Sequence, residues 1–286
     1  MLLAVATTAA LVVAVTKPFS SSTPRTRLAT LGSADGAVPP TNVAAGATST
    51  TPTTATTPTT VQGDDTSGTL PAITPPVPGA AQVVFHGPTD TGAVALTFDD
   101  GYCDACVAGL VAGAERTGAH VTFCPNGVYG TVTWDKYATR IRALIAKGQV
   151  AICNHTWDHH DLTKMSAEQI TTELTRNEAW IEQEFGVTSR PYYRPPYGFH
   201  NAVVDRIAAQ IGYTQVLIWS GSLSDSTVQT PQTILDQMKK YDTAGTIILG
   251  HANHPATAAE FDTLVQVATA TGLKLVTIPE LLRSTA

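Results

Sequence analysis

The sequence predicts an α/β fold built on a parallel sheet or a (β/α) barrel. Short runs of β-branched and other apolar residues alternate with longer segments that have helical periodicity, and the apolar runs are continuous. Continuous apolar runs are typical of strands buried on both faces, and strand–helix alternation is typical of parallel sheets. The pattern occupies residues 82–286, which we assign to a single domain.

The segments before this domain have a different composition. Residues 1–19 are mostly apolar, over a length that fits a signal peptide or membrane anchor, although no Lys or Arg precedes the apolar run. Residues 20–81 are rich in Thr, Pro, Ser and Ala and predict a disordered linker. We therefore expect a secreted or extracytoplasmic protein, with membrane attachment through the N-terminal segment as the alternative.

The charge distribution excludes one class of partner. The formal net charge is -6, and the folded part contains no basic cluster. Binding to nucleic acid therefore has no support. The oligomeric state stays open, with a monomer favoured.

The expected strands and helices can be located from their composition and end signals. Strands are predicted at residues 93–98, 120–124, 149–153, 215–219, 246–250 and 273–277. One helix follows Ser166 as N-cap, with Gln169 completing a capping box and Gly186 ending the helix. Another begins at Thr230-Pro231.

Four cysteines predict two disulfides in an oxidising compartment. Three pairings are open from sequence alone. Cys124 and Cys153 end strands that should be neighbours, so we favour that pair, whereas Cys103 and Cys106 stay open.

Polar residues follow several of the predicted strands. Asp99 and Asp100 follow the first strand, His155 follows the third, and His251 follows the strand at 246–250. Ligand sites of parallel sheets and barrels lie at the carboxyl ends of the strands. We therefore expect these side chains, with Arg194 in the turn "RPPYG", to converge on one rim.

A metal site is predicted from a carboxylate and two imidazoles. His155 and His159 are four residues apart, which in one helical turn places both rings on one side, and Asp100 would add a third ligand. A His2Asp set with open positions suits a catalytic zinc ion. The alternative for the histidine pair is a solvated helix surface, and for Asp99 and Asp100 a turn or helix N-cap.

Four ordered motifs resemble those of a known family. "TFDDG" (97–101), "HTWDH" (155–159), "RPPYG" (194–198) and "ILGH" (248–251) are similar to the NodB-homology polysaccharide deacetylases, carbohydrate esterase family four. The resemblance implies a distorted, incomplete (β/α) barrel. It also implies a divalent metal, usually zinc, with cobalt or nickel as alternatives.

The resemblance implies a role for each motif residue. Asp99 would be the catalytic base, oriented by Arg194, and His251 the catalytic acid. The implied metal ligands are Asp100, His155 and His159. The implied contacts to the substrate are the Tyr197 backbone N–H, for the oxyanion, and Leu249, for the acetyl methyl group.

One motif departs from the family pattern. "WSGSLSDST" keeps Trp219 and Asp225 but has Ser222 and Ser226 where the family usually has a second aspartate and a second tryptophan. We expect Asp225 to pair with His251, while the acetyl pocket loses one wall.

The function predicted from these residues is metal-dependent removal of N-acetyl groups from an N-acetylglucosamine polysaccharide of peptidoglycan or chitin type. One alternative is O-deacetylation of acetylated xylan. Another is a non-catalytic carbohydrate-binding wall protein that retains the fold.

Overall fold

The computed structural model describes residues 68–283, all within the unit Gln62–Ala286. The predicted signal peptide or anchor, and the linker up to residue 67, lie outside the described residues. Residues 68–81 contain neither helix nor strand. Among the described residues, no helix combines the length and the apolar character needed to cross a bilayer.

The strands form two sheets in which every ladder is parallel. The larger sheet has the order β4-β3-β2-β8-β7, with β9 also pairing β2, and the smaller has the order β1-β6-β5. Strands of the larger sheet are β2 (Ala93–Asp100), β3 (Val121–Pro125), β4 (Val150–Ile152), β7 (Gly221–Ser222), β8 (Ile247–His251) and β9 (Lys274–Leu275). Those of the smaller sheet are β1 (Gln82–Val84), β5 (Tyr192–Tyr193) and β6 (Gln215–Leu217).

The two sheets are joined into a distorted, incomplete (β/α) barrel, as predicted. A parallel bridge between Asn154 and Tyr193 connects β4 to β5. β6 and β7 follow each other along one segment that changes partner: the Ile218 N–H donates to Val84, and the Ser220 N–H donates to Ile247 of β8. The barrel is distorted because β1 pairs only with the first part of this segment.

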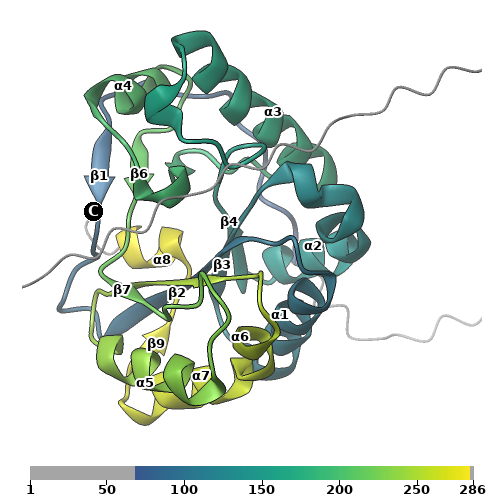
Figure 1. Ribbon diagram of the computed structural model, residues 1–286, viewed down its shortest axis with the longest axis vertical. Coiled ribbons are helices and arrows are strands. Elements are labelled where there is room, and N and C mark those ends of the chain that lie inside the picture. Colours follow the sequence, from purple (N-terminus) through teal and green to yellow (C-terminus); the bar gives the residue numbers. More distant parts are fainter. Residues whose placement is uncertain (1–67, 284–286) are drawn as a thin grey trace, which may run out of the picture. The chain divides into compact units, whose positions relative to one another are not determined.

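The helices lie around most of the strands, whereas β1 lies at one edge of the view (Figure 1). α3 packs against α2 and α4, and α1 packs against α6 and α7. The α-helices are α1 (Asp104–Thr117), α2 (Ala138–Ala146), α3 (Ala167–Phe185), α4 (Ala202–Gln210), α5 (Pro231–Tyr241), α6 (Pro255–Ala259), α7 (Phe261–Ala270) and α8 (Ile278–Arg283). Short 3-10 helices are η1 (Gly127–Val132), η2 (Trp134–Tyr137), η3 (Leu162–Lys164) and η4 (Pro196–Gly198).

The predicted helix ends are confirmed. Ser166 and Gln169 form a reciprocal capping box at the start of α3, and Gly186 ends that helix in the left-handed conformation with φ 73°. The Thr230 side chain caps α5 and Pro231 occupies its first turn. These local signals act through hydrogen bonds within a few residues, which is why sequence alone located them.

Side-chain alternation along β2 separates two apolar cores. Val94, Leu96 and Phe98 belong to the large core that includes buried residues of the helices. Ala93 and Ala95 belong to a smaller core with residues of β1, β6, β8 and α8. Alternate residues of a strand point to opposite faces, so β2 has one face toward each core.

Some predicted bounds differ from the structure. The first strand continues through Asp99 and Asp100, and the strand predicted at 215–219 ends at Leu217. The short strands β1 and β7 were not predicted, because two or three residues give too little periodicity to recognise.

Both disulfides are formed within the described part of the chain. Cys124 pairs with Cys153, as predicted from neighbouring strands, and this bond joins the ends of β3 and β4. Cys103 pairs with Cys106 at the start of α1, which resolves the pairing that sequence left open.

Candidate active site

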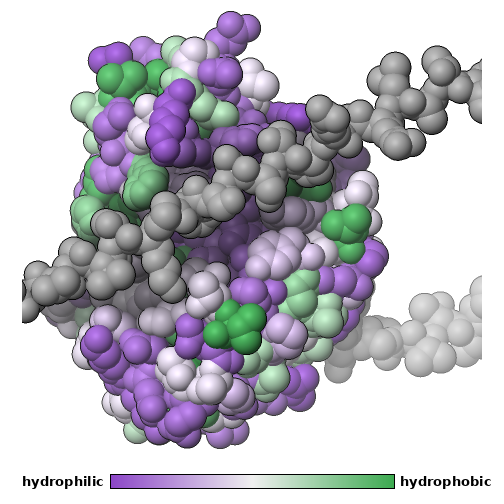
Figure 2. Space-filling view, in the orientation of Figure 1, coloured by the Kyte–Doolittle hydropathy of each residue, from purple (hydrophilic) through white to green (hydrophobic). Residues whose placement is uncertain are grey.

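All of the predicted site residues except Arg194 and Asp225 line one cavity of about 300 Å³ at the carboxyl ends of the strands. Arg194 and Asp225 are buried behind it and pair with two of the lining residues, Asp99 and His251. β2, β7 and β8 supply residues directly, and the segments after β4, β5, β6 and β7 supply the others. The lining consists of Asp99, Asp100, His155, His159, Pro195, Tyr197, Gly198, Trp219, Ser222, Ser226, Leu249 and His251. Figure 2 shows one face of the molecule, on which hydrophilic and hydrophobic residues are intermixed around a central hollow with a hydrophilic floor.

A local backbone change brings two adjacent aspartates into the same cavity. Alternation along β2 places Asp99 on the face of Ala93 and Ala95, toward the barrel interior. Asp100 would face the opposite way, but its φ of 67° breaks the alternation. This left-handed conformation is stabilised because the Trp134 Nε1–H donates to the Asp100 carbonyl at 2.9 Å.

Gly101 permits this close contact with Trp134. Its φ is 105°, and a Cβ atom there would lie 2.2 Å from Trp134 Nε1. Only glycine fits both the backbone angle and the space. The glycine of "DDG" therefore allows the turn after β2 to pack directly against the Trp134 indole.

Asp100, His155 and His159 form a candidate metal site. Their nearest ligand atoms lie within 4.8 Å of one another. Asp100 Oδ1 is 3.4 Å from His155 Nε2 and 3.4 Å from His159 Nε2. His155 Nδ1 donates to the Arg194 carbonyl at 2.8 Å, which leaves Nε2 as the atom that faces Asp100.

The helical turn predicted for the two histidines is wrong. His155 and His159 lie in an irregular loop after β4, in which Thr156 and His159 have φ of 67° and 63°. Glu173 of α3 accepts the N–H groups of Trp157 and Asp158, each at 3.1 Å. The tertiary contact with α3 stabilises a loop that brings the rings together without a helix.

The triad residues have displaced pKa values. Burial and the positive charge of His155 lower the pKa of His159 to about 4. Burial opposes ionisation of Asp100, but contact with His155 and the charges of the nearby imidazoles outweigh it and lower its pKa. An ionised carboxylate beside a neutral imidazole is the form in which both groups bind a cation.

Asp99 is held by a buried arginine. Arg194 Nη1 donates to Asp99 Oδ1 at 2.6 Å and to Thr97 Oγ1 at 2.9 Å, and the arginine is fully buried. Asp99 Oδ2 lies 3.5 Å from His155 Nε2. One oxygen of Asp99 is thus paired with a guanidinium while the other faces the triad.

His251 is paired with Asp225, as predicted. His251 Nδ1 lies 2.8 Å from Asp225 Oδ1, and the His251 backbone N–H donates to Asp225 Oδ2 at 3.0 Å. Thr257 Oγ1 donates to the same oxygen at 2.6 Å. Burial lowers the pKa of His251, but the hydrogen bond and charge of Asp225 outweigh burial, so this pKa lies above its ordinary value.

The remaining predicted residues form the rim and wall of the cavity. Tyr197 has φ of 60° and is half exposed, and its ring packs against His159 with centroids 4.5 Å apart. Trp219 contacts Gly198, where a Cβ atom would lie 2.9 Å from the indole. Leu249 is buried in β8. Ser222 and Ser226 occupy the wall where larger residues were expected.

Several supporting residues were not assigned a role from sequence. Trp134 and Thr257 hold Asp100 and Asp225, as described above. Asn126 donates to the carbonyls of His155 and Thr156. Their positions follow no spacing rule relative to the motifs, so only the tertiary contacts identify them.

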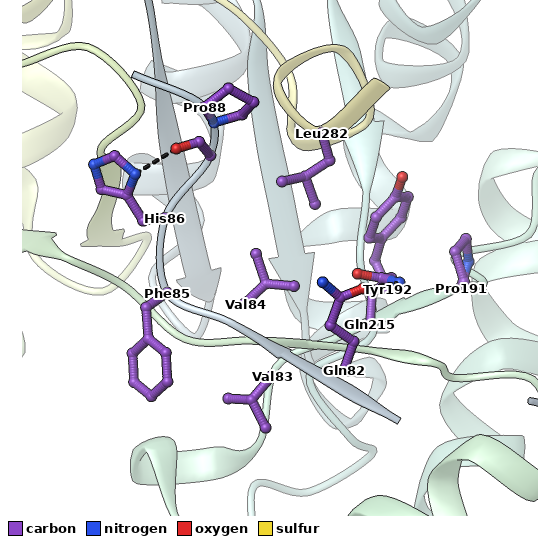
Figure 3. A pocket seen from close by; sticks show the side chains of 11 residues that line it. Gln82, Val83, Val84, Phe85, His86, Pro88, Pro191, Tyr192, Gln215 and Leu282 are labelled. Carbon is purple, nitrogen blue, oxygen red and sulfur yellow. Dashed lines mark hydrogen bonds between the residues drawn. The ribbon is translucent and has the colours of Figure 1, made fainter. Parts of the chain in front are cut away.

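A larger cavity of about 600 Å³ lies away from this chemistry. It is lined mostly by residues 82–88, with Leu282 of α8 pointing toward Val84 (Figure 3). Its lining contains no carboxylate, and its histidine, His86, contacts the Gly87 carbonyl. It therefore lacks the acid–base and metal-ligating groups of the smaller cavity.

The fold and the site together define a class: (β/α) barrels with a candidate metal triad beside an Asp–Arg and a His–Asp pair. Residues 86–216 match the model of the polysaccharide deacetylase family. The chain is 32% identical to a solved structure described as a T48 deacetylase with substrate, at a TM-score of 0.60, over 68% of this chain and 92% of that chain. The chain therefore belongs to the polysaccharide deacetylase family.

Two further similar proteins differ in whether they are described as active. Peptidoglycan-N-acetylglucosamine deacetylase PgdA of Listeria monocytogenes is 30% identical to this chain over 188 residues. The match covers 66% of this chain but only 38% of the length of PgdA. A CE4 family pseudoenzyme from Bacillus anthracis has the same fold, at a TM-score of 0.63 and 19% identity over 71% of this chain and 69% of that chain. The fold thus occurs in a named deacetylase and in a pseudoenzyme, so activity has to be argued from the site residues.

Proposed function

We propose that this protein is a metal-dependent hydrolase that removes N-acetyl groups from an N-acetylglucosamine-containing polysaccharide of peptidoglycan or chitin type. The observation that carries the proposal is one cavity lined by the Asp100–His155–His159 triad and by Asp99 and His251. Asp99 is paired with the buried Arg194, and His251 with the buried Asp225. Amide hydrolysis needs an electrophilic centre, a base and an acid, and the cavity contains candidates for each.

The triad fits a divalent cation. Within the described part of the chain, Asp100 Oδ1 is buried and has no hydrogen-bond partner, and it faces two imidazole nitrogens. Two imidazoles and one carboxylate suit zinc, and cobalt or nickel fit the same donors. When bound, such a cation supplies Lewis acidity that favours ionisation of water and polarises a carbonyl oxygen.

The residues around the triad carry the proton transfers. Asp99 takes the proton of the attacking water, and the hydrogen bond from Arg194 orients the Asp99 carboxylate. His251 then donates a proton to the departing amine nitrogen, and its pairing with Asp225 keeps it protonated. Both groups line the same cavity, as this sequence of steps requires.

The rim residues position the acetyl group. The Tyr197 backbone N–H stabilises the oxyanion, and Leu249 and Trp219 line the space for the methyl group. The two serines, Ser222 and Ser226, leave this wall more polar than a tryptophan would.

The substrate class and location rest on the relatives. PgdA is named as a peptidoglycan-N-acetylglucosamine deacetylase, and a wall polymer lies outside the cytoplasm. We therefore propose an extracytoplasmic site of action, consistent with the apolar N-terminal segment of the sequence.

The decisive test is Asp99→Asn, assayed by acetate release from chitooligosaccharides and peptidoglycan. We expect a loss of about 10²- to 10⁴-fold in turnover, because general base catalysis contributes that amount. Zinc content, measured on the same preparation, should not change because Asp99 lies outside the triad. Full turnover in this variant would refute the mechanism.

Substrate choice is tested by assaying the wild-type protein on chitooligosaccharide, peptidoglycan and acetylated xylan in parallel, with and without a chelator. We expect chelator-sensitive release from the first two. Release from acetylated xylan alone would make the protein an O-deacetylase. Glycan binding with no acetate release in zinc, cobalt or nickel would make it a non-catalytic wall protein.

A further inference from the structure

Asn253 joins the loop after β8 to the candidate metal site. This asparagine is buried, two residues beyond His251. Its Nδ2 donates to Asp100 Oδ2 at 2.6 Å, and its Oδ1 accepts the Gly101 N–H at 3.1 Å. The Asn253 side-chain amide therefore binds two consecutive residues of the β2–α1 turn, one through its nitrogen and one through its oxygen.

The amide gives the two oxygens of Asp100 different environments. Oδ2 is occupied by Asn253, whereas Oδ1 is 3.4 Å from each of the two imidazole nitrogens. Strand alternation does not set the direction of the Asp100 side chain, because its φ of 67° lies outside the strand conformation. The hydrogen bond from Asn253 supplies the missing constraint.

We propose that Asn253 is a positioning residue that holds Asp100 so that one carboxylate oxygen is presented to the cation. The inference rests on the metal site of the proposed function. A neutral amide donor suits this position because an acidic residue would repel the Asp100 carboxylate. Hydrogen-bonded partners of ligating carboxylates tune metal affinity in this way.

The same residue links the metal site to the segment that carries the proposed acid. Asn253 and His251 lie on one short segment, and the His251 backbone N–H is fixed by Asp225. The parallel register of β8 with β2 places His251 beside Asp99, and Asn253 adds a contact from the following loop to Asp100. The loop after β8 thus connects two functional units through one side chain.

A purely structural role for Asn253 would act through Gly101, and the chain offers a control for it. Thr133 Oγ1 donates to the Gly101 carbonyl at 2.8 Å, so it stabilises the same turn without touching the Asp100 carboxylate. Thr133→Val removes this bond at nearly constant volume. Asn253→Ala removes both the turn contact and the carboxylate contact.

The experiment measures metal binding by the full chain, separately from acetate release. Zinc affinity is obtained by competition with a chromogenic chelator, cobalt geometry from the visible absorption of the Co²⁺ form, and stability from urea unfolding. We expect Asn253→Ala to weaken zinc binding by about 10- to 100-fold and to change the Co²⁺ spectrum. Thr133→Val should lower stability while leaving both metal readouts as in the wild type.

Two outcomes would overturn the inference. One is wild-type zinc affinity and an unchanged Co²⁺ spectrum in Asn253→Ala. The other is an equal loss of affinity in Thr133→Val, which would assign the effect to the turn. If the metal effect is found but no acetate is released by the wild-type protein, the proposed function fails while the role of Asn253 stands.

Discussion

At the scale of single residues, neighbouring side chains of one type have distinct environments. Asp99 is paired with a buried guanidinium, whereas Asp100 contacts two imidazoles and an amide. The difference arises because Asp99 follows strand alternation and Asp100 leaves it. Residue identity alone thus does not assign the roles, and the contacts made by each carboxylate do.

The His251–Asp225 pair predicts a pH effect. Asp225 holds the pKa of His251 above its ordinary value of 6.5. An acid must be protonated, so activity should fall as pH rises through this pKa, and Asp225→Asn should move that limb of the pH–rate profile to lower pH. Asp205→Asn is the matched control, because Asp205 pairs with His200 at 2.9 Å outside the cavity lining. Equal shifts in both variants would contradict the prediction.

The Arg194–Asp99 pair predicts a large loss of stability on truncation. Arg194→Met leaves a buried carboxylate without its partner and should cost about 3–5 kcal/mol in urea unfolding. Arg116 makes a similar contact with Asp262 at 2.7 Å, but both side chains are exposed. Arg116→Met should therefore cost much less, because solvent screens an exposed pair. A loss for Arg194→Met as small as that for Arg116→Met would argue against the buried pair.

At the scale of elements, the site depends on how strands end. β2 ends in a left-handed residue followed by Gly101, and the turn is closed by Trp134 of η2 and Asn253 of the loop after β8. α3 stabilises the histidine loop through Glu173. The turn after β2 and the loop that contains His155 and His159 are therefore both stabilised by contacts with other elements.

Gly101→Ala tests the turn after β2, with Gly148→Ala as its control. Gly148 also has a positive φ, 76°, but a Cβ atom there would meet nothing within 4 Å. Its substitution should cost only the left-handed penalty of about 1–2 kcal/mol. Gly101→Ala should cost about 1–3 kcal/mol more in urea unfolding, because its Cβ overlaps the Trp134 ring. Equal losses in the two variants would mean that Trp134 moves without cost.

At the scale of the whole molecule, parallel pairing joins distant segments of the chain. Asp99 of β2 is in register with Cys124 of β3 and His251 of β8. This register brings the proposed base and the proposed acid to the same level of the barrel. The disulfide between Cys124 and Cys153 fixes β4, and hence the histidine loop, beside β3.

The two disulfides should contribute unequally to stability. Cys124 and Cys153 are 29 residues apart, and closing such a loop removes about 3–4 kcal/mol of unfolded-state entropy. Cys103 and Cys106 are separated by 3 residues, so their bond should contribute about half as much. Urea unfolding of the two double-alanine variants measures both effects. A larger loss for the Cys103/Cys106 variant would contradict this reasoning.

The fold and most of the cavity lining were predictable from sequence for a physical reason. Apolar runs, helix caps and the motif residues at strand ends act locally, so Ser166, Gly186 and the Asp99–Asp100 pair could be located without a structure. The helical turn assigned to His155 and His159 was wrong, because contact with Glu173 overrides the i, i+4 spacing. Short strands such as β7 depend on partners far along the chain.

The sequence by itself determined the fold class, the rim on which the polar residues lie, the pairing of Cys124 with Cys153 and the resemblance to deacetylases. Only the tertiary structure decided which oxygen of Asp100 faces the imidazoles, and that Trp134, Thr257 and Asn253 support the site. The physical reason is the distance along the sequence over which each interaction acts. Periodicity and capping are written within a few residues, whereas the direction of a carboxylate depends on hydrogen bonds from residues such as Asn253, 153 positions away.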